Sequence, residues 1–227
     1  MPTPPPAIPP SALAARLVHA DAARITVASA TAIQTIELKL SDDPSLARRV
    51  IRLLPPQLAR DVTDDVLAHR ELARLTPARP LSAFRLGPAA AAARLRAFYA
   101  EAQRRSGVPW QLLAAVNFVE SDFGRLREAS VAGAQGPMQF MPSTWRSYGR
   151  GDIHDPRAAI LAAGRFLRAA GAPSNERGAL YRYNPSAAYV DAVERYAGRI
   201  RRSVRAFRQY YARPVVVRTP EGYRRLR

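Results

Sequence analysis

The chain has 227 residues, of which 48% are hydrophobic, so it can bury a core and does not have the composition of a disordered protein. It contains no cysteine, which excludes disulfides and thiolate metal sites, and its three histidines are too scattered to indicate a metal site. The formal net charge of +17 favours polyanionic partners such as nucleic acid, anionic lipid or an anionic wall polymer, without choosing among them.

The N-terminal part is predicted to be helical after a proline-rich lead-in at residues 1–10, and residues 11–87 form a helical region of unknown role. A helix is expected from Pro56 to Leu75, followed by a proline-marked linker. The best apolar run, Ile25 to Ile36, is too short to span a bilayer, which needs about 20 apolar residues. The first residues are also not a signal peptide, so we expect no transmembrane segment and no export signal in this chain.

Residues 88–200 are predicted to form a second helical domain. One helix begins at Pro109 and is closed by Gly124, and a glycine-rich loop follows at 125–136. Asp155 and Ser186 are each expected to cap a helix, and the second of these helices carries an apolar face. The core is predicted to contain Tyr189 and Tyr196 of this face, together with Trp145 of a short preceding helix.

The last segment, residues 201–227, is strongly basic, because from Arg199 to the end there are ten arginines and a single acidic residue. It is expected to begin helical, with a short extended piece and a turn over 214–222. Two roles are open for it: a patch that binds anionic cell-envelope polymers, or a solvated and partly disordered end.

Glu120 is the residue that the pattern alone singles out. It lies four residues after Val116 and seven after Leu113, which places it at the C-terminal end of the buried stripe of its helix. Burial and the negative end of the helix both favour the neutral carboxyl and raise its pKa, as a proton donor to a glycosidic oxygen requires. The alternative is a core glutamate that pairs with one of the many arginines.

Four segments in series resemble the soluble lytic transglycosylase (SLT) family of peptidoglycan-cleaving enzymes. They are the Glu-Ser helix at 108–121, a Gly-Pro-Met-Gln loop at 132–142, the helix at 155–171 and a Tyr-Asn motif at 180–185. The departures are Pro137, where the family often has leucine, and Arg182, where it often has alanine. The resemblance covers about 90 of the 227 residues, so the N-terminal region and the basic tail lie outside it.

The resemblance implies an all-α, lysozyme-like catalytic domain, to which this chain adds the N-terminal helical region and the short basic C-terminal segment. It implies that Glu120 first protonates the glycosidic oxygen and then acts as a base toward the C6 hydroxyl of the same muramyl sugar. It implies no cofactor and no metal. The substrate-binding residues that it implies are Ser121, Ser130, Gly136, Met138, Gln139, Tyr183 and Asn184.

Some of these residues have alternative interpretations. Ser130 could instead be a loop or capping serine, and Met138 could pack in the core. Gly136 is expected to let the backbone approach the sugar. Tyr183 is expected to hydrogen-bond or orient Glu120, with a core aromatic as its alternative.

An ordinary glycosidase needs a second carboxylate across the scissile bond. Asp122 should point away from Glu120, Asp155 is used as a cap, and Asp152 stays open as a candidate. The predicted activity is therefore lytic transglycosylase, acting on peptidoglycan glycan strands outside the cytoplasm, in the periplasm, cell wall or medium. The alternatives are a lysozyme-type hydrolase on the same fold and a non-catalytic wall-binding module. No signature of specific nucleic-acid binding is present.

Overall fold

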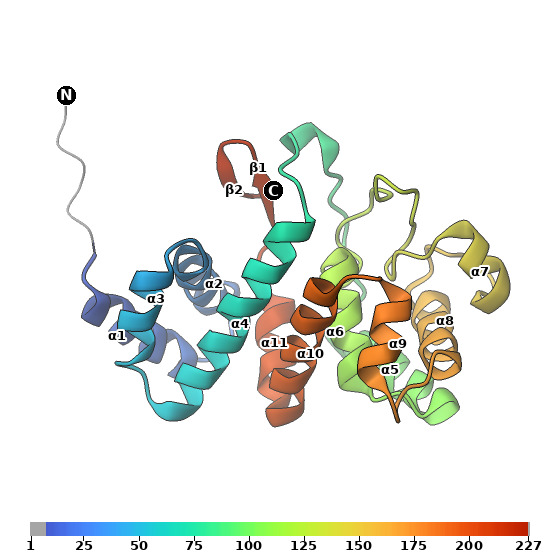
Figure 1. Cartoon of the computed structure of the whole chain (residues 1–227), viewed down its shortest axis with the longest axis horizontal. Helices are drawn as coiled ribbons and strands as arrows, with labels where there is room; N and C mark the ends of the chain where they lie inside the picture. Colours follow the sequence, from blue (N-terminus) through green and yellow to red (C-terminus); the bar gives the residue numbers. More distant parts are fainter. Residues whose placement is uncertain (1–7, 227) are drawn as a thin grey trace.

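The structure, a computed structural model, describes residues 8–226 (Figure 1). Over these residues the chain forms eleven α-helices, one short 3-10 helix and one two-stranded antiparallel sheet, so the predicted all-α class is confirmed. The proline-rich lead-in lies mostly outside the described residues. The elements are α1 (Pro10–Ala22), α2 (Val27–Asp42), α3 (Pro44–Ile51), α4 (Pro56–Leu75), η1 (Leu81–Ala83), α5 (Ala92–Ser106), α6 (Trp110–Ser121), α7 (Pro142–Tyr148), α8 (Pro156–Ala169), α9 (Glu176–Tyr183), α10 (Ala187–Arg202), α11 (Val204–Ala212), β1 (Val216–Thr219) and β2 (Gly222–Arg225).

Local sequence signals set several of the helix boundaries. The predicted helix from Pro56 to Leu75 is confirmed as α4. The side chain of Asp155 accepts a hydrogen bond from the backbone N–H of Ala158 at 2.7 Å, and the Ser186 hydroxyl accepts one from Tyr189 at 3.3 Å. Both predicted caps are therefore present, and each satisfies an amide that the first turn of its helix would leave unpaired.

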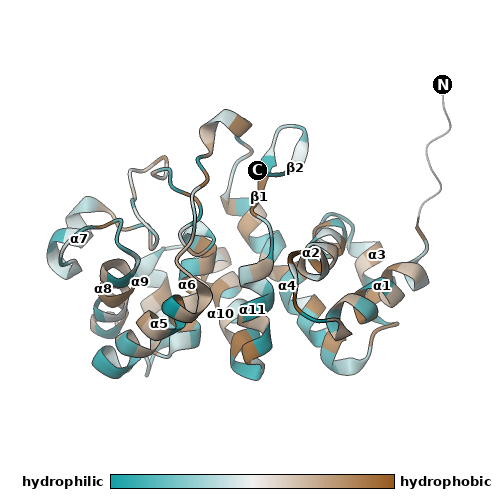
Figure 2. Cartoon of the chain, turned by 180° about the vertical axis from the view of Figure 1, so that it is seen from behind, coloured by the Kyte–Doolittle hydropathy of each residue, from teal (hydrophilic) through white to brown (hydrophobic). Residues whose placement is uncertain are grey.

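Two apolar clusters form the interior. The first consists mainly of residues of helices α1 through α4, and the second consists mainly of residues from α5 through α11. Helix α4 contributes to both, with Val62 and Val66 in the first cluster and Ala68 in the second. It therefore lies between the N-terminal helices and the rest of the molecule, as Figure 1 shows. Hydrophilic and hydrophobic residues alternate along the helices, as expected where one face of each helix is buried (Figure 2).

A buried ion cluster joins the N-terminal helices to the rest of the molecule. It consists of Glu37, Asp65, Arg199 and Arg213. Each of the four side chains is at most 2% exposed. Arg199 of α10 and Arg213 both bond the carboxylate of Asp65 in α4, the latter at 2.8 Å, and Arg213 also contacts Glu37 of α2 at 2.7 Å. The N-terminal helices are thus joined to α10 by ion pairs that are shielded from water. The division at residues 87 and 88 stays a prediction.

The two carboxyl groups of the buried ion cluster respond differently to their surroundings. Burial raises the pKa of Asp65, but Arg199 and Arg213 outweigh it and lower the pKa to about 2, so this carboxylate stays ionised. Burial raises the pKa of Glu37 well above its ordinary value despite the nearby Arg213. Asp65 is therefore the charged centre of the cluster.

The basic C-terminal segment is folded, which corrects the expectation of a partly disordered end. Residues 204–225 form α11 and the β1–β2 hairpin, with Val216 paired to Arg225 and Thr219 to Gly222, so the predicted extended piece and turn are confirmed. Some of its arginines make contacts within the protein: Arg213 lies in the buried ion cluster, and the exposed Arg205 donates to the carbonyl oxygen of Asp21 at 2.6 Å. The remaining basic charge gives no support for a polymer-binding tail. Among residues 8–226, no helix combines the length and apolar character needed to cross a membrane.

Replacing Asp65 by alanine should lower the free energy of unfolding by about 3–5 kcal/mol. Arg199 and Arg213 would stay buried without their ionised partner, and the carboxyl left beside them, Glu37, has a raised pKa. Denaturant unfolding followed by circular dichroism measures the change. The exposed Asp42→Ala is the matched control and should cost less than about 0.5 kcal/mol. Equal, small losses in the two variants would contradict a stabilising role for the cluster.

Candidate active site

Glu120 lies in the last turn of α6, where the helix meets a sharp change of chain direction. Leu112, Leu113 and Val116 of α6 are fully buried, so the helix is fixed within the core. The three residues after Ser121 all have positive φ, with values of 51°, 62° and 83° at Asp122, Phe123 and Gly124. This run of left-handed residues ends the helix and leaves Glu120 at its edge.

The surroundings of Glu120 keep about half of its carboxyl groups protonated at pH 7. Burial raises its pKa from the ordinary value to about 7, and a hydrogen bond from Tyr189 opposes part of that rise. The Tyr189 hydroxyl, on α10, lies 2.6 Å from Oε1 of Glu120. The group can therefore donate a proton in neutral solution and hold it again after it is returned.

Glu120 borders a cleft of about 330 Å³. The walls come from four parts of the chain: the end of α4 with the segment after it, the end of α6 with the loop after it, the end of α9 and the start of α10. The lining residues are Leu72, Leu75, Thr76, Arg79, Phe84, Val119, Glu120, Leu126, Glu128, Ala129, Ser130, Gln139, Asn184 and Tyr189.

Three of the predicted substrate-binding residues line this cleft together with Glu120. They are Ser130, Gln139 and Asn184. The Ser130 hydroxyl also accepts a hydrogen bond from the backbone N–H of Ala134 at 2.9 Å, so it caps the loop as its alternative interpretation had it. Gln139 has a φ of 45° and donates from Nε2 to the carbonyl of Gly136 at 3.0 Å. Hydroxyl and amide groups therefore share the cleft with Glu120, and groups of this kind can hydrogen-bond the hydroxyls of a ligand.

Three further predicted residues support the loop instead of facing the cleft. Ser121 is fully buried, and its hydroxyl lies 2.5 Å from the carbonyl oxygen of Pro137 and 2.8 Å from the N–H of Gly124. Met138 is fully buried in the core, as its alternative interpretation had it. At Gly136, with φ of 75°, an added Cβ would lie 2.1 Å from the carbonyl oxygen of Ile153, so packing and backbone conformation require glycine there.

Tyr189 takes the position that was expected of Tyr183. The hydroxyl of Tyr183 donates to the carbonyl oxygen of Met138 at 2.6 Å, and the hydrogen bond to Glu120 comes from Tyr189. Tyr189 was predicted as a core residue, and its ring is indeed buried, but its hydroxyl reaches the edge of the core where Glu120 lies. Tyr183 instead fixes the loop that carries Gln139.

A second carboxylate lines the cleft, and it is one that the sequence did not single out. Glu128 accepts a hydrogen bond from the backbone N–H of Arg85 at 3.0 Å. Asp122 pairs with Arg125 at 2.6 Å, and burial raises its pKa to about 6, while Asp155 caps α8. Within residues 8–226, no group of three or more His, Asp or Glu side chains is arranged to hold a metal ion.

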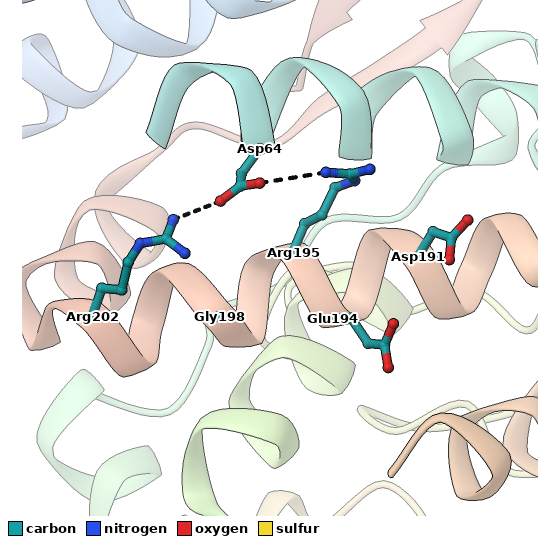
Figure 3. A pocket seen from close by; sticks show the side chains of 6 residues that line it. All are labelled: Asp64, Asp191, Glu194, Arg195, Gly198 and Arg202. Carbon is teal, nitrogen blue, oxygen red and sulfur yellow. Dashed lines mark hydrogen bonds and ion pairs between the residues drawn. The ribbon is translucent and has the colours of Figure 1, made fainter. Parts of the chain in front are cut away.

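Another cavity lies between α4 and α10, and Figure 3 shows its charged lining. Asp64 of α4 pairs with Arg195 at 3.4 Å and with Arg202 at 2.6 Å, both on α10. Asp191 and Glu194 pair with Arg177. The charges of this cavity are thus matched within the protein, and they strengthen the joint between α4 and α10.

Comparison with known proteins bears on the same part of the chain. Residues 98–204 match the family model of the transglycosylase SLT domain. The chain contains an SLT domain. Glu120, the loop after it and Tyr189 all lie inside the matched residues, so the family predicted from sequence is confirmed, and with it the lysozyme-like class of the SLT fold.

A membrane-bound lytic murein transglycosylase F of Thiobacillus denitrificans is 38% identical to the chain over 73 residues. That alignment covers 32% of this chain but only 15% of the relative, so most of the relative's length has no counterpart in the match. No solved structure matches the chain. The SLT domain therefore accounts for the middle of this chain, and the cleft residues Leu72 to Phe84 lie outside it.

Replacing Tyr189 by phenylalanine should raise the pKa of Glu120 further, by about one unit. The hydrogen bond from Tyr189 stabilises the ionised carboxylate, and the variant lacks it. The Cδ resonance of Glu120, followed by NMR titration and assigned by its loss in Glu120→Gln, measures the change. Tyr183→Phe is the matched control, since that hydroxyl bonds a carbonyl. A fall of the pKa in Tyr189→Phe, or the same rise in both variants, would contradict the assignment.

Proposed function

We propose that the protein is a peptidoglycan lytic transglycosylase. It cleaves the β-1,4 bond between N-acetylmuramic acid and N-acetylglucosamine and leaves a 1,6-anhydromuramyl end. The observation that carries this proposal is a carboxyl with a pKa of about 7 at the edge of a cleft, inside an SLT domain. The polar side chains of Ser130, Gln139 and Asn184, which line the same cleft, support it.

In the first step, Glu120 gives its proton to the glycosidic oxygen while the bond from that oxygen to the muramyl C1 breaks. Positive charge develops at C1 and on the ring oxygen. Glu120 becomes a carboxylate at this moment, and the Tyr189 hydroxyl at 2.6 Å stabilises the new charge. Burial raises the pKa to about 7, so at neutral pH a large share of the molecules carries the proton before substrate binds.

In the second step, the C6 hydroxyl of the same muramyl sugar attacks C1, and its proton passes to Glu120. The new C6–O–C1 bond closes the anhydro ring, the carboxyl is neutral again, and no water is consumed. One carboxyl group is sufficient for this sequence. The substrate's own N-acetyl group would stabilise the charge at C1.

Binding of the sugars is assigned to the polar side chains that share the cleft with Glu120, namely Ser130, Gln139 and Asn184. Ser121 and Tyr183 would act indirectly, since they bond the carbonyls of Pro137 and Met138, two consecutive residues of the loop that carries Gln139. The substrate lies outside the cytoplasmic membrane, so we place the protein there as well, in the periplasm, cell wall or medium.

Replacing Glu120 by glutamine should lower the release of muropeptides from purified peptidoglycan by about 10²–10⁴-fold, because the proton donor is lost while size and shape are kept. Mass spectrometry of the products measures both rate and chemistry. Products of the unchanged protein should carry anhydro ends and lack the added water of hydrolysis. Equal release by both proteins would reject Glu120 as the catalyst and favour a non-catalytic wall-binding module.

A lysozyme-type hydrolase is the second candidate, and Glu128 is the observation that favours it. This carboxyl lines the same cleft as Glu120, as the second carboxyl of a hydrolase must. Its hydrogen bond from the N–H of Arg85 gives it a structural use as well, because it joins the loop after α6 to the segment before α5. We therefore assign Glu128 to holding that loop.

Replacing Glu128 by glutamine tests the two candidates directly. Glutamine keeps an oxygen that can accept from Arg85, so a transglycosylase should lose less than about tenfold in rate and give the same anhydro products. Asp152→Asn, outside the cleft lining, is the matched control. A loss of about 10³-fold or more in Glu128→Gln alone, with water-added products from the unchanged protein, would replace transglycosylase by hydrolase.

A further inference from the structure

One wall of the cleft is built from residues outside the SLT domain. Leu72, Leu75 and Thr76 close α4, and Arg79 and Phe84 lie in the segment that follows. In Figure 1 this segment rises on the same side of the molecule as the loop after α6. The prolines of residues 77–88 predicted only a linker here, yet the segment faces Glu120 across the cleft.

This wall is held firmly in place. The backbone N–H of Arg79 donates to the carbonyl oxygen of Arg218 in β1 at 3.1 Å, and the Arg218 side chain donates to the carbonyl of Ala73 at 2.8 Å. On the other side, Gly87 donates to Arg125 and Arg127 donates to Arg85, each at 2.9 Å. The segment is thus fixed both by the C-terminal hairpin and by the loop after α6.

Arg79 is the cationic side chain of the cleft lining. It is partly buried, its guanidinium carbon lies 5.2 Å from the centre of the Phe84 ring, and Nη2 makes a long 3.4 Å contact with the carbonyl of Ala83. Within residues 8–226 it forms no ion pair with a carboxylate, although many arginines of the chain do. A guanidinium that is held against a ring and lacks an anion is arranged to bind one from outside.

We propose that Arg79 binds a carboxylate of the substrate, so that the wall outside the SLT domain recognises the acidic groups attached to the muramyl sugar. The inference rests on the proposed function. A guanidinium fork matches a carboxylate with two parallel hydrogen bonds, which a neutral sugar hydroxyl cannot provide. Leu72, Leu75 and Phe84 beside it give apolar surface for the carbon chain that bears the carboxylate. Two sources fit: the stem peptide, or the lactyl group once the peptide has been removed.

Binding to the non-cleaving Glu120→Gln protein tests the proposal, with Arg79→Ala and Arg79→Lys added in that background. Three soluble ligands are compared by calorimetry: glycan fragments with stem peptides, the same fragments stripped by an amidase so that the lactyl carboxylate is free, and chito-oligosaccharides that carry no carboxylate. Arg79→Ala should weaken binding of a carboxylate-bearing ligand by about 10–100-fold and leave the chito-oligosaccharide unchanged. Arg79→Lys should recover part of the loss, because it keeps the charge and loses the fork.

The ligand that responds identifies the source. A loss with peptide-bearing fragments alone points to the stem peptide, and a loss with stripped fragments alone points to the lactyl group. Arg208→Ala, an exposed arginine of α11 outside the cleft lining, removes the same charge and should change no affinity by more than about twofold. Unchanged thermal unfolding of the Arg79 variants shows that the wall is intact.

Equal weakening with all three ligands, or no weakening with either carboxylate-bearing ligand, would overturn the proposal. The result is separable from the proposed function. Loss of cleavage in Glu120→Gln together with unchanged binding in Arg79→Ala would sink the inference alone. Selective loss of carboxylate binding in a protein that cleaves no peptidoglycan would leave the subsite standing and reject the enzyme.

Discussion

Helix α10 is fixed by polar contacts that have little or no access to water, one near each end. At its start the Tyr189 hydroxyl bonds Glu120, and toward its end Arg199 bonds the carboxylate of Asp65. Such contacts are directional and strong in a low-dielectric interior, so the helix cannot slide without breaking one of them. The position of the tyrosine that stabilises the ionised acid is therefore tied to α4 and, through the buried ion cluster, to α2 as well. The N-terminal helices belong to the framework of the cleft, although they lie outside the SLT domain.

The electrostatics of Glu120 are notable in a chain with a net charge of +17. Asp65 is surrounded by arginines and has a pKa of about 2, whereas the pKa of Glu120 is set by burial and one tyrosine, with no cation beside it. An arginine at ion-pair distance would stabilise the carboxylate of Glu120 and lower its pKa, so that the carboxyl would be ionised at neutral pH. The same chain thus keeps one buried acid ionised and lets another take up a proton near neutral pH, and the difference comes from where its arginines lie.

Local sequence patterns were sufficient to predict the helices and the position of Glu120 in its helix. They were insufficient to predict the residues that surround Glu120. Caps such as Asp155 and the stripe that ends at Glu120 depend on neighbours within about two turns, which sequence spacing reports directly. The periodicity of α10 correctly placed the Tyr189 ring in the core, but the partner of its hydroxyl is 69 residues away and leaves no local trace. The place of Glu128 in the cleft could not be predicted for the same reason. The long-range pairing of Leu86 with Leu126 lies next to it in the chain. Ser121 and Met138 fall in recognisable motifs, yet they hold the loop from inside.

The contact between Arg79 and Arg218 joins stretches of sequence that are far apart, and neither lies in the SLT domain. Glu120 and the opposite wall of the cleft are consequently encoded in separate parts of the chain. Mutations in the hairpin or in the segment after α4 can reshape that wall while the helix bearing the acid keeps its packing. Evolution, or a protein engineer, could in this way vary which ligands the cleft admits without disturbing the surroundings of Glu120.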